Sequence, residues 1–167
     1  RDTISTFEVV RDVIKPQTAA SRCRYIELES AAAASGPPDV FVSHSWGAPF
    51  ADMVAAIGHV LADEQRVWLD LFAVRQWPGN AADLDFSPAI EASHGFVLVS
   101  KHIDSVAAMK FDATTQASRD PPEAALRMCA FYRLWCVVEL AAALRFAKPV
   151  VMLVGGRGAD DAFTASK

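Results

Sequence analysis

Four short apolar runs, separated by segments with helical periodicity, constrain the fold of this chain more than any other feature. Runs that are hydrophobic on both sides are typical of strands buried inside a parallel sheet. These runs are residues 39–43, 66–70, 95–100 and 149–154. Strands that alternate with helices form right-handed βαβ units. We therefore expect an α/β protein with a flavodoxin-like parallel sheet of four to five strands and helices on both faces.

The segments between the runs predict the remaining elements. Apolar side chains recur at helical spacing in residues 49–61, and residues 133–144 contain good helix formers without Gly or Pro. Residues 71–82 contain Pro and Gly and predict a loop, and Gly155-Gly156 is expected to end the last strand. Further helices are expected at about 85–93, near 103–109 and from about 120. Whether the last of these ends near 130 or continues into 133–144 is left open.

The first 36 residues precede this pattern. They predict a helix over 3–14 that Pro16 ends, a short strand at 23–28, and a loop rich in Gly and Pro. A length of 167 residues fits one domain. We expect an N-terminal extension (1–36) packed on the core, a main domain (37–158) and a C-terminal tail (159–167). Because the chain begins with Arg rather than Met, we expect it to be part of a longer protein.

Composition argues against several function classes. The formal net charge of −4 leaves no basic surface for nucleic acid or an anionic membrane, and no apolar run approaches the roughly 20 residues of a membrane-spanning helix. Three cysteines form an odd, sparse set that suits a reducing compartment, so we expect a cytoplasmic protein. The cysteines and the four histidines lack the spacing of a zinc site, and we expect no metal.

Glu139 is the one charged residue between Arg133 and Arg145 in the predicted helix 133–144. Its helical neighbours three and four positions away include no cation; they are Trp135, Cys136, Ala142 and Ala143. A carboxylate in apolar surroundings needs a partner from elsewhere. Glu139 is therefore either paired with a distant basic group or placed in a cleft for use.

The predicted topology places a ligand site before any family is considered. In open parallel sheets, ligands bind beyond the carboxyl ends of the strands. Polar and aromatic residues follow three of the predicted strands there; they are Ser43-His44-Ser45-Trp46, Asp70 and Ser100-Lys101. The sequence thus predicts a pocket for a flat, polar ligand.

Three stretches, in this order, resemble the TIR (Toll/interleukin-1 receptor) domain. They are D-V-F-V-S-H-S at 39–45, V-W-L-D at 67–70 and W-C-V-V-E-L at 135–140, the last close to the plant form. The resemblance covers about residues 38–155. It departs from the family pattern in the long loop at 71–80, the long segment 101–130 and the N-terminal extension.

The resemblance implies a flavodoxin-like fold and cleavage of NAD+ by the glutamate of the W-C-x-x-E motif, here Glu139. It implies that the substrate contacts six residues, which are His44, Ser45, Trp46, Asp70, Phe86 and Trp135. NAD+ is then a substrate, and no cofactor is expected. The products are nicotinamide and ADP-ribose or a cyclic variant, and homotypic TIR–TIR self-association activates the enzyme.

Two other functions remain open. A non-catalytic TIR scaffold would make homotypic signalling contacts through the loop at 75–80. The other is an enzyme that acts on nucleic acid or on another N-glycoside, although the acidic net charge argues against nucleic acid.

Several side chains also have two interpretations. His44 and Asp70 either serve the core and loop or bind ligand, and Arg133 either contacts phosphate or braces the start of its helix. Trp135 and Cys136 either pack in the core or contact the ligand, and Cys136 is not expected to act as a nucleophile, because no histidine is near it in sequence. Trp68 is expected in the core, Arg75 at the surface, and Trp77 exposed or lining a cleft.

Overall fold

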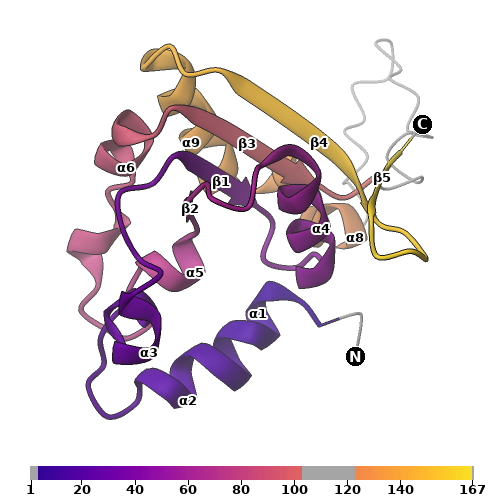
Figure 1. Cartoon of the computed structure of the whole chain (residues 1–167). Helices are drawn as coiled ribbons and strands as arrows, with labels where there is room; N and C mark the ends of the chain where they lie inside the picture. The colour runs from indigo at the N-terminus through magenta and orange to yellow at the C-terminus, as the bar shows by residue number, and fades with distance from the viewer. Residues whose placement is uncertain (1–3, 103–122, 167) are drawn as a thin grey trace, which may run out of the picture.

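The computed structural model describes residues 4–102 and 123–166, and its centre is a five-stranded sheet in the order β2-β1-β3-β4-β5 (Figure 1). The strands are β1 (Val40–His44), β2 (Val67–Trp68), β3 (Gly95–Ser100), β4 (Val150–Arg157) and β5 (Phe163–Ala165). The first four are parallel, and β5 runs antiparallel to β4. This arrangement confirms the predicted α/β, flavodoxin-like sheet.

Alternate side chains of the strands face two separate cores. Val42 and Val99 pack on one face with α4 (Phe50–Val60) and the N-terminal helices, whereas Phe41 and Leu98 pack on the other. That second face is covered by α6 (Ser87–Ala92) and α9 (Leu134–Arg145). Helices thus cover both faces, as the continuous apolar runs predicted.

Phe41 is the centre of the second core. It is fully buried and stacks on Trp68 at 4.4 Å and on Phe96 at 5.5 Å between ring centroids. Trp68 therefore packs with the core, as expected.

The region after β2 differs from the expectation. The strand has two residues instead of five, and α5 (Asp70–Ala73) begins directly after Leu69, where a loop was expected. The Asp70 carboxylate accepts the N–H of Leu71 at 2.7 Å, which supports a turn in place of a longer strand. A 3₁₀ turn, η3 (Ala81–Leu84), precedes α6.

The prediction that Gly155-Gly156 ends the last strand is wrong. β4 continues to Arg157 because Gly155 and Gly156 pair with Ala165 and Thr164 of β5, a strand within the expected C-terminal tail. A Cβ on Gly155 would lie 2.2 Å from the Thr164 carbonyl oxygen, so the two strands approach each other closely only because this residue lacks a side chain.

The first helix is also longer than predicted. Three consecutive helical pieces follow one another without a break: α1 (Thr6–Val9), the π-helical η1 (Val10–Ile14) and α2 (Lys15–Thr18). Pro16 does not end the helix because it directly follows the π-helical turn η1, where the regular i→i−4 hydrogen-bond pattern is already interrupted. Val10 and Ile14 are buried in the core, which anchors the extension.

The strand expected at 23–28 is absent. The 3₁₀ turn η2 (Tyr25–Glu27) and α3 (Glu29–Ala32) occupy this part of the chain. The Glu27 carboxylate accepts the backbone N–H of Arg24 at 2.8 Å, and this local bond favours a turn over an extended strand.

The segment before the W-C-V-V-E-L motif has two breaks. α8 (Glu123–Met128) ends first, η4 (Ala130–Tyr132) follows, and α9 begins separately. The helix from about 120 therefore stops before the motif. The helix expected near 103–109, and the start of the one at 120, lie outside the described residues. None of the described helices has the length and apolar character needed to cross a bilayer.

Two glycines with opposite surroundings test this packing. We expect Gly155→Ala to destabilise the protein by about 1–3 kcal/mol, since its methyl group would collide with β5. Gly58→Ala, in α4 with open space at its Cβ, is expected to stabilise by about 0.5–1 kcal/mol. Urea unfolding measures both. Equal stability of the two variants would contradict the close β4–β5 pairing.

Candidate functional site

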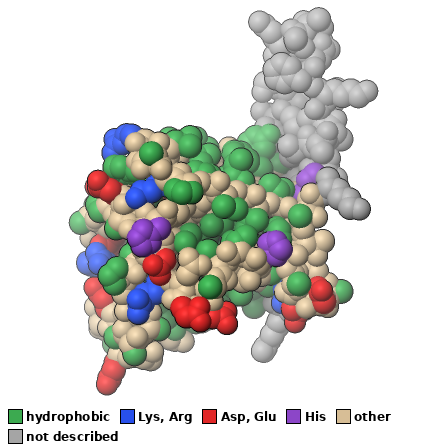
Figure 2. All heavy atoms as spheres, turned by 45° about the horizontal axis from the view of Figure 1, so that its top comes forward, with side chains coloured by type: hydrophobic (Ala, Val, Ile, Leu, Met, Phe, Trp, Pro, Cys, Tyr) green, Lys and Arg blue, Asp and Glu red, His purple; other side chains and the backbone are tan. Residues whose placement is uncertain are grey.

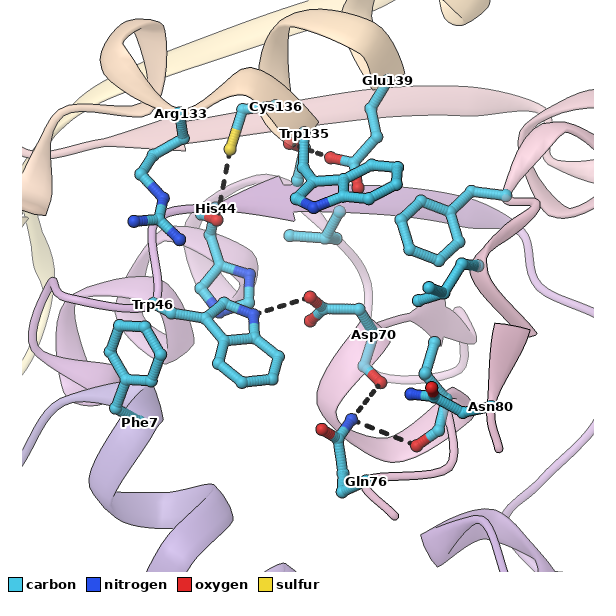
Figure 3. A pocket seen from close by; sticks show the side chains of 15 residues that line it. Phe7, His44, Trp46, Asp70, Gln76, Asn80, Arg133, Trp135, Cys136 and Glu139 are labelled. Atoms are coloured by element: carbon cyan, nitrogen blue, oxygen red, sulfur yellow. Dashed lines mark hydrogen bonds between the residues drawn. The ribbon is translucent and has the colours of Figure 1, made fainter. Parts of the chain in front are cut away.

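A cavity of about 280 Å³ opens at the carboxyl ends of β1 and β2 (Figure 3). Its walls come from the end of β1, the segment after β2, the start of α6 and the first turns of α9. Six of the seven residues expected from the sequence line it, and these are His44, Trp46, Asp70, Phe86, Trp135 and Glu139.

Three other residues expected near the ligand lie elsewhere. Ser45 does not line this cavity; its hydroxyl donates to the backbone carbonyl of Arg127 and so ties the end of β1 to α8. Ser100 accepts the N–H of a residue of η4 at 3.1 Å. Lys101 forms an ion pair with Asp52 at 2.7 Å. The polar residues after β3 thus join structural elements, and the cavity forms on the β1–β2 side of the sheet.

Glu139 is buried at the cavity wall, with 6% of its surface exposed. The Ser43 hydroxyl donates to its Oε2 at 2.5 Å, and within the described parts of the chain no Lys, Arg or His pairs with it. Burial raises the pKa of Glu139 to about 8, because the charged form loses its water; Asp70 adds to this shift and the Ser43 bond opposes it. The carboxyl group is therefore mainly protonated at neutral pH.

His44 both lines the cavity and serves the core. Its Nε2 lies 3.1 Å from the Thr6 hydroxyl, which α1 supplies. Burial lowers the pKa of His44, although the Asp70 charge partly offsets this. The imidazole is therefore neutral near pH 7 and provides no positive charge beside Glu139.

Asp70 likewise lines the cavity and also bonds its own loop. Its Oδ2 accepts the indole N–H of Trp46 at 2.6 Å, while its Oδ1 caps the N–H of Leu71 at 2.7 Å. The bond to Trp46 holds that ring over the cavity, where its edge meets Phe7 at 5.3 Å between centroids. Trp46 and Asp70 thus form a fixed wall.

Aromatic rings form the opposite wall. Trp135 is half exposed and contacts Phe86 with ring centroids 5.6 Å apart. Phe86 in turn contacts Trp68 at 5.1 Å, which anchors this wall in the core. In Figure 3 the Trp135 indole lies beside Glu139, so a flat ligand can stack on an aromatic face next to the carboxyl group.

Other polar, aromatic and sulfur-containing side chains line the cavity beyond the six contacts that the resemblance implies: Phe7, Ser43, Gln76, Asn80, Arg133 and Cys136. Ser43 and Arg133 were already candidates from the sequence. Phe7 belongs to a helix that the sequence places far from the motif. Gln76 and Asn80 donate their amides to carbonyls of their own loop, which fixes its shape. Burial raises the pKa of the Cys136 thiol to about 11, which agrees with packing and argues against a nucleophile.

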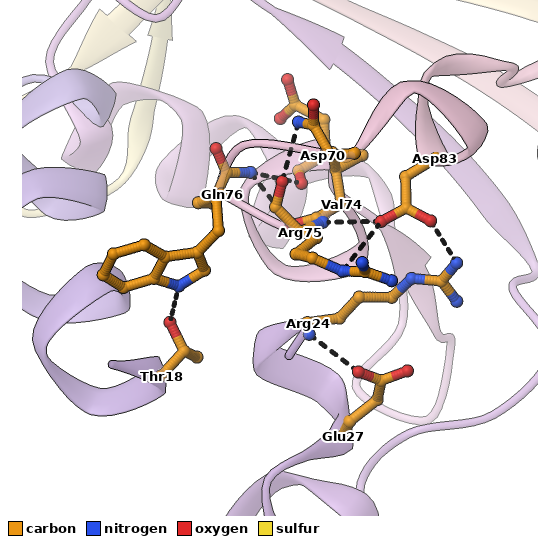
Figure 4. Close-up of polar contacts among 10 residues, drawn as sticks. Thr18, Arg24, Glu27, Asp70, Val74, Arg75, Gln76 and Asp83 are labelled. Carbon is orange, nitrogen blue, oxygen red and sulfur yellow. Dashed lines mark hydrogen bonds and ion pairs between the residues drawn. The ribbon is translucent and has the colours of Figure 1, made fainter. Parts of the chain in front are cut away.

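The loop that carries Gln76 and Asn80 is held against the N-terminal extension (Figure 4). The indole N–H of Trp77 donates to the Thr18 hydroxyl at 3.0 Å, so Trp77 does not line the cavity. The Asp83 side chain, which is 4% exposed, pairs with Arg24 of the extension, and Arg75 points to the same carboxylate at 3.9 Å. Contacts within the chain thus position this side of the cavity.

Comparison with protein-family models, curated proteins and solved structures gave no match for this chain. In the described residues, no group of three or more His, Cys, Asp and Glu side chains is arranged to hold a metal ion.

The raised pKa of Glu139 predicts a pH-dependent stability. The unfolded carboxyl ionises near 4.5 and the folded one near 8, so ionisation favours the unfolded state across this window. Relative to Glu139→Gln, the wild type should lose stability as pH rises from about 4.5 to about 8, by about 1 kcal/mol for each pH unit within that window. Urea unfolding at several pH values measures the difference.

Glu64→Gln, on the surface, provides the control and should follow the wild type. Parallel pH curves for wild type and Glu139→Gln would contradict a buried, unpaired carboxyl group.

Proposed function

We propose that this chain is a TIR-type domain that cleaves the bond between nicotinamide and ribose in NAD+. The observation that carries the proposal is the Glu139 carboxyl group, buried in a cavity wall with a serine hydroxyl as partner and, in the described residues, no basic side chain. Such a group is costly to bury, and clefts are where such groups serve ligands. The ordered motifs at 39–45, 67–70 and 135–140 add support from sequence.

The reaction needs little machinery. The nicotinamide ring of NAD+ is already cationic, so it leaves as a neutral molecule without a general acid. The reaction therefore does not need the acid carboxyl group, which is one of the two carboxyl groups that glycosidases commonly use. The Glu139 carboxylate would stabilise the positive charge that develops on the ribose and would bond its hydroxyls. Water then attacks the ribose carbon, which gives ADP-ribose and releases a proton. Alternatively, an adenine nitrogen attacks the same carbon and gives a cyclic product.

The substrate's charge favours the active form of Glu139. A cationic ring bound beside the carboxyl group lowers its pKa, since opposite charges favour ionisation. Trp135 and Phe86 offer an aromatic wall for that ring. In the free protein the pKa stays near 8, so kcat/KM is expected to rise with pH through this value.

An assay with NAD+ tests the proposal. The purified chain should release nicotinamide, and Glu139→Gln should lose about 10²-fold or more of this activity, because it removes the charge at the reacting centre. Far-ultraviolet circular dichroism checks that the variant is folded, and Glu64→Gln serves as the matched surface control. Equal turnover in wild type and Glu139→Gln would remove Glu139 from the mechanism.

The second candidate function is self-association as a protein–protein contact module. We place this module in the reducing environment of the cytoplasm. Self-association is favoured by large apolar side chains exposed on α9 and β4. They include Leu134, Val138 and Leu144 of α9 and Met152 of β4. In Figure 2, hydrophobic side chains gather on the face where β4 lies in Figure 1, with charged groups toward its margin. The loop at 75–80 is less suited to this contact, because it is held within the chain.

Self-association would also serve the enzyme. If copies meet through the α9–β4 face, Met152→Glu should lower the molecular mass measured by light scattering at high concentration, because it buries a charge in the contact. Specific NADase activity that rises with protein concentration in the wild type, and not in the variant, is the expected outcome. A monomer at every concentration would refute this contact.

A further inference from the structure

The charges that line the cavity are segregated. Glu139 and Asp70 lie on its walls, and among the described lining residues Arg133 is the one Lys or Arg. In Figure 3 the Arg133 guanidinium and the Glu139 carboxyl group extend from the same helix region toward different parts of the cavity. Glu139 is six residues further along, which corresponds to about 9 Å of helix rise.

Among the described residues, the Arg133 guanidinium has no acidic partner. Within the described residues it forms no ion pair or side-chain hydrogen bond, and its contact is with the Phe7 ring, 5.9 Å from its centre. By contrast, Arg24 and Lys101 pair with buried carboxylates elsewhere in the chain. An arginine that is held on an aromatic ring and lines a cavity keeps its hydrogen-bond donors for a ligand.

The Arg133 side chain is not needed to stabilise the start of α9. The backbone N–H of Arg133 donates to the Ala130 carbonyl at 3.0 Å, and its carbonyl accepts the N–H of Val137 at 3.2 Å. The side chain makes no capping bond at the start of α9. The backbone thus accounts for the helix start, and the guanidinium is left for the cavity.

The spacing of charges indicates the kind of ligand. Arginine binds phosphate through two parallel hydrogen bonds, with geometry that a carboxylate or phosphate matches. A ligand with an anionic group at one end and a cationic or hydroxyl-rich group at the other fits Arg133 and Glu139 together. At about 280 Å³ the cavity is near the lower end of ligand pockets, so it suits one nucleotide unit better than a whole dinucleotide.

We propose that Arg133 binds the 5′-phosphate of the substrate, so that the site selects phosphorylated N-ribosides over the free nucleosides. The minimal ligand is then nicotinamide mononucleotide, and the adenosine half of NAD+ extends past Arg133 out of the cavity. Phe7, from the N-terminal extension, holds the guanidinium in place. This inference rests on the proposed function.

Binding to the full chain carrying Glu139→Gln tests the inference without turnover. Isothermal titration calorimetry compares nicotinamide mononucleotide with nicotinamide riboside, which differ by the phosphate alone. We expect the mononucleotide to bind about 10- to 100-fold more tightly, as a charge-assisted bond implies. Adding Arg133→Gln should reduce this ratio to about one and leave the riboside affinity unchanged.

Two further variants keep the test decisive. Arg145→Gln removes the same charge from the exposed C-terminal end of α9 and should preserve the ratio. Arg133→Lys keeps the charge without the planar fork and should give an intermediate ratio. If Arg133→Gln does not fold, the ratio measured for Arg133→Lys tests the inference instead.

The outcomes separate the two proposals. If both ligands bind equally, or the ratio survives both changes at Arg133, the phosphate role is overturned while the proposed function stands. If neither ligand binds, both proposals are overturned. Loss of the ratio in Arg145→Gln would show a nonspecific effect of net charge and would also overturn the assignment.

Discussion

The hydrogen bond between Ser43 and Glu139 is the contact on which the site depends. It joins the end of β1 to the second turn of α9, and it is the polar partner that the structure gives to a carboxyl group buried in apolar surroundings. One hydroxyl compensates only part of the lost hydration, and the pKa of Glu139 therefore stays high. A basic side chain beside Glu139 would hold α9 more firmly in position. It would also neutralise the carboxyl group that the cavity presents to a ligand.

The N-terminal extension completes the same site. Thr6 bonds His44, Phe7 supports both Trp46 and Arg133, and Thr18 holds Trp77 of the loop beside the cavity. These contacts come from a helix anchored by Val10 and Ile14 in the core. The extension is therefore part of the cavity wall.

Several local predictions differed from the structure for reasons that involve distant residues. Gly155 was expected to end a strand, but β5 pairs with it because the missing side chain permits a close approach. Pro16 was expected to end a helix, but it occupies a first turn after a π-helical segment. Ser45 was expected at the ligand, yet its hydroxyl meets a carbonyl of α8. In each case the residue has the local property from which the prediction was made, but contacts with distant residues give that property a different structural result.

By itself the sequence determined the α/β class, the four parallel strands and the residue that stands out chemically, because burial on both sheet faces demands continuous apolar runs and a lone Glu139 in a helix has no local partner. It also brought the carboxyl ends of the strands together, since parallel strands share an edge. Only the tertiary structure decided that Ser43, Phe7 and Arg133 meet in that cavity, and that Arg133 has no carboxylate beside it in the described chain. The Phe7–Arg133 contact joins residues 126 positions apart and the Ser43–Glu139 bond residues 96 apart, and no periodicity in a sequence encodes the distance between side chains so far separated.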